Sequence, residues 1–177
     1  DPAREAGAVE TLLQLQADGL IMLGPMMSVS RIDAAARHVP VVVVGLNTRA
    51  RALDSVRNDD VAGAAAVVGH LARLGHRRIA HIHAGTAGGS RGRRRGYEQA
   101  MKRHGLAAEI RSVRGAFTEA GGMRAMRSII ESENRPTAVF VANDLAAMGA
   151  LEALADAGLR VPDDVSLVGY DDIITSH

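Results

Sequence analysis

The chain has 177 residues, which is enough for one large hydrophobic core or for two smaller lobes. Hydrophobic residues make up 47% and charged residues 23%, and the formal net charge of +1 argues against a strongly basic nucleic-acid-binding domain. The absence of cysteine excludes disulfides and thiolate chemistry, and the longest apolar run, 40–46, is too short to span a bilayer. No secretory signal opens the sequence, so we expect a cytoplasmic protein with no membrane partner.

Helical patterns and short apolar runs alternate along the chain. The expected elements are, in order, helix 2–17, strand 19–23, helix 30–37, strand 41–44, helix 60–74, strand 79–82, helix 93–104, strand 109–113, helix 119–131, strand 138–142, helix 144–157 and strand 165–168. This alternation predicts an α/β fold with doubly wound parallel sheets. Because the first helix has no strand before it, we expect the chain to be part of a longer protein.

The loops that follow the predicted strands are candidates for a ligand site, because ligands of open parallel sheets bind at the carboxyl ends of the strands. These loops are 24–25, 45–47, 84–92, 115–117, 143–144 and 170–172. The chain has two tyrosines and two phenylalanines, and three of these (Tyr97, Phe117 and Tyr170) lie in or just after such loops. This distribution favours a binding site at that edge of the sheet.

Three loop residues carry groups suited to a polyhydroxylated ligand. Asn143 stands between a strand and a helix, where it is expected to cap the helix, and its amide can also face a polyol or a purine. Asp171 and Asp172 follow the last strand; neighbouring side chains there diverge, which argues against a catalytic pair and favours Asp171 accepting hydrogen bonds from two ligand hydroxyls. Arg93, at a helix start, is a fork-shaped donor to hydroxyl or carboxylate oxygens.

Other motifs favour no catalytic chemistry. Phe117 either fills the core or stacks on a sugar or base. His81 and His83 share one face of a strand without an apparent third ligand, so no metal site is expected. The glycine-rich stretch 85–92 lacks the lysine of a P-loop and is expected to be a mobile loop. Without a nucleophile signature or a cofactor loop, we expect no catalytic residue, no cofactor and no enzyme.

The most informative stretches, taken together, point to one family. They are ADGLIML (17–23), VPVVVVG (39–45), SV and D (55–59), HLARLGHRRIAHI (70–82), RRRGYEQAM (93–101), GAFTEAGG (115–122), RPTAVFVANDLAAMGAL (135–151) and GLRVPDDVSLVGYDDI (158–173). In order and spacing they resemble the effector-binding core of LacI/GalR-type transcriptional regulators. GHRRIA and VPDDVSLVGYDD are the most discriminating of them.

The resemblance implies a periplasmic-binding-protein-like fold of two doubly wound parallel-sheet lobes, 1–57 and 58–177, of which the first is incomplete in this chain. It further implies that a small effector, such as a sugar or polyol, binds in the cleft between the lobes. Operator DNA would be bound only through a helix-turn-helix that this chain lacks. The alternative is a solute-binding protein of a sugar import system, which shares the fold.

Carried over by position, the resemblance assigns effector contacts to the residues that the loops already single out. These are Arg93, Phe117, Asn143 and Asp171, with Arg91 as a weaker candidate at the mouth of the cleft. Where some sugar-responsive members carry an aspartate, this sequence has Gly45. The stretch SRGRRRGY (90–97) is therefore interpreted as a loop entering a helix, with Arg93 facing the ligand, rather than as a DNA-binding patch.

The helix expected over 144–157 is apolar around most of its circumference. Such a helix must bury two faces. One is expected to pack on the sheet and the other on a second copy of the chain, which predicts a homodimer.

Overall fold

The computed structural model describes residues 1–46, 48, 50–86 and 88–173. Asn47 and Ala87, which belong to two of the loops expected to face a ligand, lie outside the described residues. The chain divides into two compact units, Asp1–Asn58 (unit 1) and Asp59–His177 (unit 2). The expected boundary was after residue 57.

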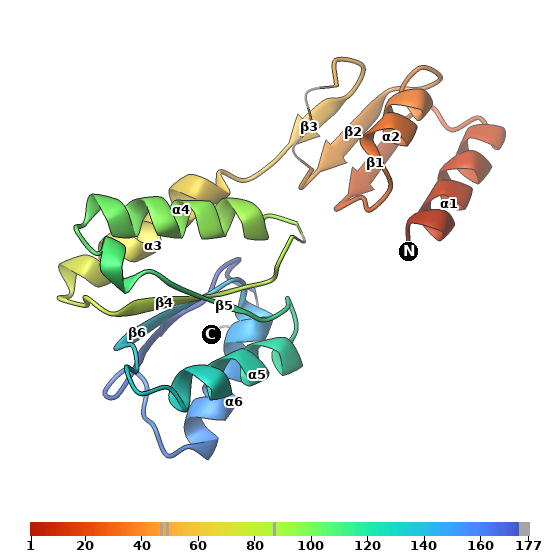
Figure 1. Cartoon of the computed structure of the whole chain (residues 1–177). Coiled ribbons are helices and arrows are strands. Elements are labelled where there is room, and N and C mark those ends of the chain that lie inside the picture. The colour runs from red at the N-terminus through yellow and green to blue at the C-terminus, as the bar shows by residue number, and fades with distance from the viewer. Residues whose placement is uncertain (47, 49, 87, 174–177) are drawn as a thin grey trace. The chain divides into compact units, whose positions relative to one another are not determined.

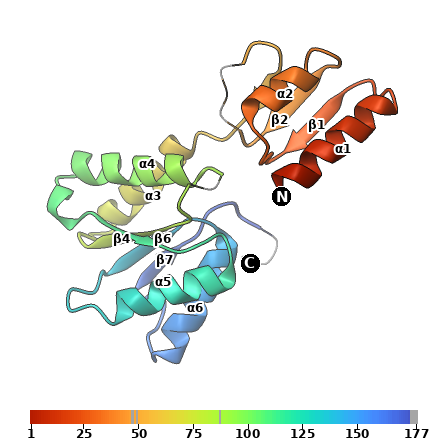
Figure 2. The same ribbon diagram turned by 45° about the vertical axis from the view of Figure 1, so that its right-hand side comes forward.

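Unit 1 consists of a small parallel sheet and two helices (Figures 1 and 2). Its elements are α1 (Pro2–Gln14), β1 (Leu20–Leu23), α2 (Val29–Ala35), β2 (Val41–Val44) and β3 (Asp54–Val56). The strand order is β1-β2-β3, with both pairs parallel. The sequence did not predict β3, a three-residue strand whose residues are all exposed.

Both helices of unit 1 contribute to one core on one face of this sheet. Alternate residues of β1 and β2 point to that face and pack with Val9 of α1 and Ile32 of α2. On the other face, Ile21 and Leu23 are 75% and 76% exposed. Parallel sheets are as a rule covered on both faces. Within the described part of the chain, this sheet instead leaves one apolar face uncovered.

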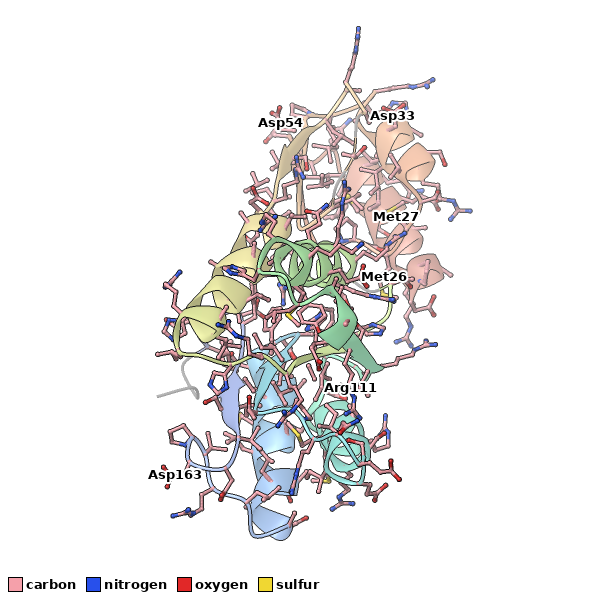
Figure 3. All side chains as sticks on the ribbon, turned by 60° about the vertical axis from the view of Figure 1, so that its left-hand side comes forward. Met26, Met27, Asp33, Asp54, Arg111 and Asp163 are labelled. Carbon is pink, nitrogen blue, oxygen red and sulfur yellow. The ribbon has the colours of Figure 1, made fainter. Side chains whose placement is uncertain are left out.

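A carboxylate fixes α1 to the loop after β1. Glu5 of α1 accepts hydrogen bonds from the backbone N–H groups of Met26 and Met27, at 2.9 and 2.8 Å. Figure 3 marks both methionines in this unit. Of the two side chains, Met27 is buried in the core and Met26 is exposed.

Unit 2 consists of four helices and a four-stranded sheet among the described residues. Its elements are α3 (Asp60–Arg73), β4 (Ile79–His83), α4 (Ser90–Arg103), β5 (Arg111–Arg114), α5 (Glu119–Ile130), β6 (Ala138–Val141), α6 (Asp144–Asp156) and β7 (Ser166–Val168), with a 3-10 turn at Ala107–Glu109. The strand order is β5-β4-β6-β7, and all three pairs are parallel.

Helices cover both faces of this sheet, as Figure 1 shows. Ile79 and Phe140 point to the side of α3 and α4, where they pack with Tyr97. Ile82 and Val139 point to the side of α5 and α6. The predicted class, α/β with a doubly wound parallel sheet, is confirmed in unit 2.

The helix that carries the arginine-rich stretch begins earlier than predicted. We expected it to start at Arg93, whereas α4 starts at Ser90, so the stretch 90–97 is helical throughout. Ser90 Oγ accepts a hydrogen bond from the Ala84 N–H at 2.9 Å. A Cβ at Gly92 would stand 2.7 Å from the Cβ of Asp60, so glycine allows α3 to approach this turn closely. The helix thus includes Gly92, where a small residue is needed, despite the low helix propensity of glycine.

None of the described helices is both long enough and apolar enough to cross a membrane.

Candidate functional site

Arg93 lies at the centre of a polar cluster in unit 2, on the first turn of α4. It is 7% exposed, and all three of its guanidinium nitrogens donate to protein oxygens. Nε donates to Asp60 Oδ1 at 3.0 Å and Nη2 donates to Asp171 Oδ1 at 3.1 Å. Nη1 donates to the backbone carbonyl of Ala142. Arg93 thus joins α4 to the start of α3 and to the carboxyl ends of β6 and β7.

Two aromatic rings flank the guanidinium group. The Tyr170 ring centroid lies 3.8 Å from Arg93 Cζ and the Phe117 centroid lies 5.7 Å from it. Both distances are within the range of a cation–π contact. The rings come from the loops after β7 and β5, so the structure brings together residues that are far apart in the sequence.

The cluster carries more negative than positive charge. One guanidinium faces two carboxylates, Asp60 and Asp171, which leaves a formal charge of −1 on the three groups. Their side chains differ in exposure: 8% for Arg93, 19% for Asp60 and 37% for Asp171. Asp171 is therefore the charged group of the cluster most open to a solute.

Burial sets the titration of the groups beside Arg93. It raises the pKa of Asp171 above its ordinary value, and the nearby carboxylates of Asp144 and Asp60 act in the same direction, against the lowering effect of Arg93. Burial also raises the pKa of Tyr170, with a further contribution from Asp60. Burial and the two neighbouring carboxylates together thus outweigh Arg93 in setting the pKa of Asp171.

Asn143 caps α6, as the sequence predicted. Its side-chain oxygen accepts a hydrogen bond from the Ala146 N–H at 3.0 Å, and the residue is 8% exposed. It directly follows Ala142, whose carbonyl binds Arg93. The cap thus lies beside the cluster, and a contact of its amide with a ligand stays a prediction.

The predicted site residues are brought together to different degrees. Arg93 contacts both Phe117 and Asp171, and Asn143 is adjacent in the chain to a carbonyl that Arg93 binds. Arg91 is exposed and stands two positions before Arg93 on α4, so it points to a different side of the helix.

The sequence did not predict the roles of Asp60 and Tyr170. In the sequence, an aspartate at the first position of a helix matches the ordinary preference for acidic residues in the first turn. Its ion pair depends on α3 and α4 lying side by side, which the sequence pattern does not show. Tyr170 had one signal, its place among the few aromatic residues of the strand-end loops.

The histidines of β4 have structural contacts. His81 is fully buried, stacks on Phe140 with centroids 4.6 Å apart, and its pKa is lowered to about 3, mainly by burial. Burial lowers the pKa of His83 as well, and its Nδ1 accepts a hydrogen bond from the Gly85 N–H. No group of residues suited to holding a metal ion occurs in the described ranges.

Tyr97 lies one helical turn after Arg93 on α4. It is fully buried, and its hydroxyl donates to the Ile79 carbonyl at 2.7 Å and accepts from the Arg111 N–H at 2.9 Å. These bonds fix α4 to the neighbouring strands β4 and β5. Arg94 is exposed and pairs with Glu98 on the helix surface, at 2.8 Å.

A doubly wound parallel sheet with a polar and aromatic cluster at the carboxyl ends of its strands is the arrangement in which open α/β domains commonly bind small molecules. The family model described as a periplasmic binding protein-like domain matches residues 68–177. The chain belongs to this family. Its resemblance to the effector-binding domain of LacI-family regulators is supported by curated relatives that are HTH-type transcriptional repressors and by solved structures of LacI-family regulators.

Among curated relatives, the chain is similar to the HTH-type transcriptional repressor PurR of Klebsiella pneumoniae. The two are 35% identical over 98% of this chain and 52% of the repressor. The chain thus spans about half the length of this curated relative.

Among solved structures, the chain is similar to a LacI transcriptional regulator from a Rhodococcus species, with 41% identity and a TM-score of 0.91 over 96% of this chain and 63% of the other. A LacI-family regulator from Enterococcus faecium with bound ribose is 26% identical, with a TM-score of 0.85 over 95% of this chain and 63% of the other. The lac repressor dimer bound to operator and the anti-inducer ONPF is 28% identical, with a TM-score of 0.85 over 97% of this chain and 60% of the other. The expected resemblance and fold are confirmed.

Proposed function

We propose that this chain is the effector-sensing and dimerisation core of a LacI-type transcriptional regulator, and that its effector is a neutral sugar or polyol. The observation that carries the ligand class is the Arg93–Asp171 pair flanked by Phe117 and Tyr170. A guanidinium beside a part-exposed carboxylate offers donors and an acceptor to hydroxyl groups, and an aromatic ring packs on the apolar face of a sugar.

The charge of the cluster favours a neutral ligand over an anion. Asp60 and Asp171 already compensate the single guanidinium and leave a formal charge of −1. Among the described residues, protein oxygens accept three of the five guanidinium N–H groups of Arg93, which leaves two for a ligand. A phosphate or carboxylate would face more negative than positive charge there. The bound ribose of the Enterococcus relative supports the same ligand class.

Self-association is proposed to use α6. Its buried side is made mostly of alanine and glycine, whereas Leu145, Met148 and Leu151 recur every three residues and are 41%, 36% and 43% exposed. A regular apolar stripe of this kind fits a second copy of the chain. The solved lac repressor dimer supports a dimeric state.

Operator DNA is proposed to be bound by a part of the protein outside these 177 residues. The chain itself has a formal net charge of +1 and matches about half of a relative named as a helix-turn-helix type repressor. Effector binding here would then change DNA affinity through coupling between two sites. We propose that this regulation takes place in the cytoplasm, and that the chain needs no cofactor and catalyses no reaction; its relatives are named as repressors.

A ligand panel tests the proposed effector class. Neutral sugars and polyols, sugar phosphates, nucleobases and nucleosides are each added to the chain, and its urea unfolding is followed. A ligand at about 100 times its dissociation constant should add roughly 2.7 kcal/mol to the free energy of unfolding. We expect stabilisation by neutral sugars or polyols, and its loss in Asp171→Ala and Arg93→Ala.

Two results would contradict the proposal. Stabilisation by sugar phosphates or nucleobases alone would overturn the ligand class. A sugar whose effect survives Asp171→Ala would place the site elsewhere. The control is Asp163→Asn, because Asp163 lies in the exposed turn after α6 (Figure 3) and pairs with Arg160, away from the Arg93 cluster. A monomer at all concentrations would favour the solute-binding alternative.

A further inference from the structure

We infer that Asp144 is the positioning residue of the proposed effector site: its carboxylate holds the loop after β7 so that Asp171 and Tyr170 meet Arg93. That this site binds an effector rests on the proposed function. The contacts that position the loop all lie within unit 2.

Three hydrogen bonds join Asp144, the first residue of α6, to this loop. Its Oδ1 accepts from the Tyr170 N–H at 2.8 Å, and its Oδ2 accepts from the Ile173 N–H at 2.9 Å. Its own N–H donates to the Tyr170 carbonyl at 2.9 Å. Asp144 is 7% exposed, so these bonds form away from most solvent competition. Both carboxylate oxygens are committed to backbone groups on either side of Asp171.

The loop needs such support because its backbone is in a disfavoured conformation. Asp171 and Asp172 have φ angles of 103° and 58°, in the region that residues other than glycine rarely adopt. Outside contacts must hold such a conformation in place. The bonds to Tyr170 and Ile173 bracket the two residues.

The close approach of Asp144 also explains the residue before the loop. A Cβ at Gly169 would collide with Asp144 Oδ1. Glycine is therefore required at position 169 because a side chain there would block the carboxylate from reaching the loop.

The loop in turn places both groups that contact Arg93. Asp171 Oδ1 accepts from Arg93 Nη2 at 3.1 Å, and the Tyr170 ring lies 3.8 Å from Arg93 Cζ. The Asp144 carboxylate bonds to the backbone of Tyr170 and Ile173 rather than to Arg93. Its effect on a ligand is therefore indirect, through the position of the loop.

Asp144 is easily read as an ordinary first-turn acidic residue of a helix, where it interacts with the helix dipole. The structure separates the two roles. Asn143 supplies the capping bond of α6, to the Ala146 N–H. The Asp144 carboxylate bonds to the loop instead, so its loss should disturb the loop more than the helix.

The chain offers a clean spectroscopic test because it has two tyrosines and no tryptophan. Labelling with 3-fluorotyrosine gives one ¹⁹F signal from Tyr97, which is buried beside β4, and one from Tyr170 in the loop; Tyr170→Phe assigns them. In Asp144→Asn, an NH₂ group replaces one of the two accepting oxygens. Because NH₂ cannot accept a hydrogen bond from a backbone N–H, one of the two bonds is lost. We expect the Tyr170 signal to move toward its position in the unfolded chain while the Tyr97 signal stays.

A second readout is the titration of the same signals. Burial raises the pKa of Tyr170, so release of the loop should lower that pKa toward its ordinary value. The pKa of the labelled ring at Tyr97, which burial also raises, should not change. A merely structural loss would alter both tyrosines.

Two variants frame the result. Gly169→Ala displaces the carboxylate without removing it and should reproduce the Tyr170 change. Asp163→Asn, in the exposed turn, should change neither signal. An unmoved Tyr170 signal in Asp144→Asn would overturn the inference, as would equal movement of both tyrosines. Because no ligand is added, the outcome is separate from that of the panel that tests the proposed function.

Discussion

Replacing Arg93 by methionine tests whether the cluster in unit 2 is a connected electrostatic unit. Methionine keeps much of the apolar stem beside Tyr170 but removes the bonds to Asp60, Ala142 and Asp171. Removing one partner of a fully buried ion pair costs about 3–5 kcal/mol. The two carboxylates here are 19% and 37% exposed, so water partly replaces the lost partner. We expect a loss of about 2–3 kcal/mol from the free energy of unfolding of unit 2.

The assay is urea unfolding followed by tyrosine fluorescence. Both tyrosines, Tyr97 and Tyr170, lie in unit 2, and the chain has no tryptophan, so the signal reports this unit even if the two units unfold separately. The matched control is Arg94→Met on the same helix. Arg94 is exposed and pairs with Glu98 four residues on, so its loss should cost no more than about 0.5 kcal/mol.

The double variant Arg93→Met, Asp171→Asn completes the test. If the two side chains stabilise each other, their combined cost should fall short of the sum by about 0.5–3 kcal/mol. A cost for Arg93→Met as small as that of Arg94→Met, or strict additivity in the double variant, would refute the argument from this geometry.

Three further predictions concern other parts of unit 2 and the chain's assembly. Burial, Asp144 and Asp60 raise the pKa of Asp171 against the effect of Arg93, so the folded protein binds this proton more tightly than the unfolded chain does. The free energy of unfolding, relative to that of Asp171→Asn, should therefore fall as pH rises from about 4. A rise, measured by urea unfolding, would contradict this. Gly149→Ala should lose about 1–3 kcal/mol, since a Cβ there would collide with the Glu119 carbonyl; an unchanged urea midpoint would count against the close contact of α5 and α6. Leu151→Lys should convert a dimer into an 18.6 kDa monomer in light scattering; a wild-type monomer would remove the α6 interface.

The order of the elements was predictable because hydrophobic periodicity is a local property. The helices α5 and α6 begin at residues 119 and 144, as predicted, and the side chains of Thr118 and Asn143 form the cap bonds. The start of α4 was predicted too late because its first turn includes Gly92, and glycine gives no local helix signal; the contact of Gly92 with Asp60 of α3 is not visible in the sequence pattern. Strand β3 was missed because its exposed residues show no alternation and, within the described ranges, it pairs with β2 alone.

Much of the site was predictable from topology alone. Arg93, Phe117 and Asp171 follow strands or begin helices at one edge of a parallel sheet, so the strand-end argument brings them together without any contact being known. Asp60 and Asp144 could not be found this way. Their roles depend on which oxygen faces which N–H, and that is fixed by the packing of α3 against α4 and of α6 against the loop after β7.

In the proposed site, the contacts of Arg93 indicate different roles for Arg93 and Asp171. Because Arg93 is buried and held by three protein oxygens, its side-chain entropy is lost on folding rather than on binding, which costs up to about 2 kcal/mol for an arginine. The guanidinium is therefore in place before a ligand arrives. The same bonds leave it few N–H groups to offer, whereas Asp171 is more than four times as exposed, at 37% against 8%. A ligand should consequently gain more from hydroxyls donated to Asp171 than from acceptors placed at Arg93, and sugars that differ in the hydroxyl facing Asp171 should differ most in affinity.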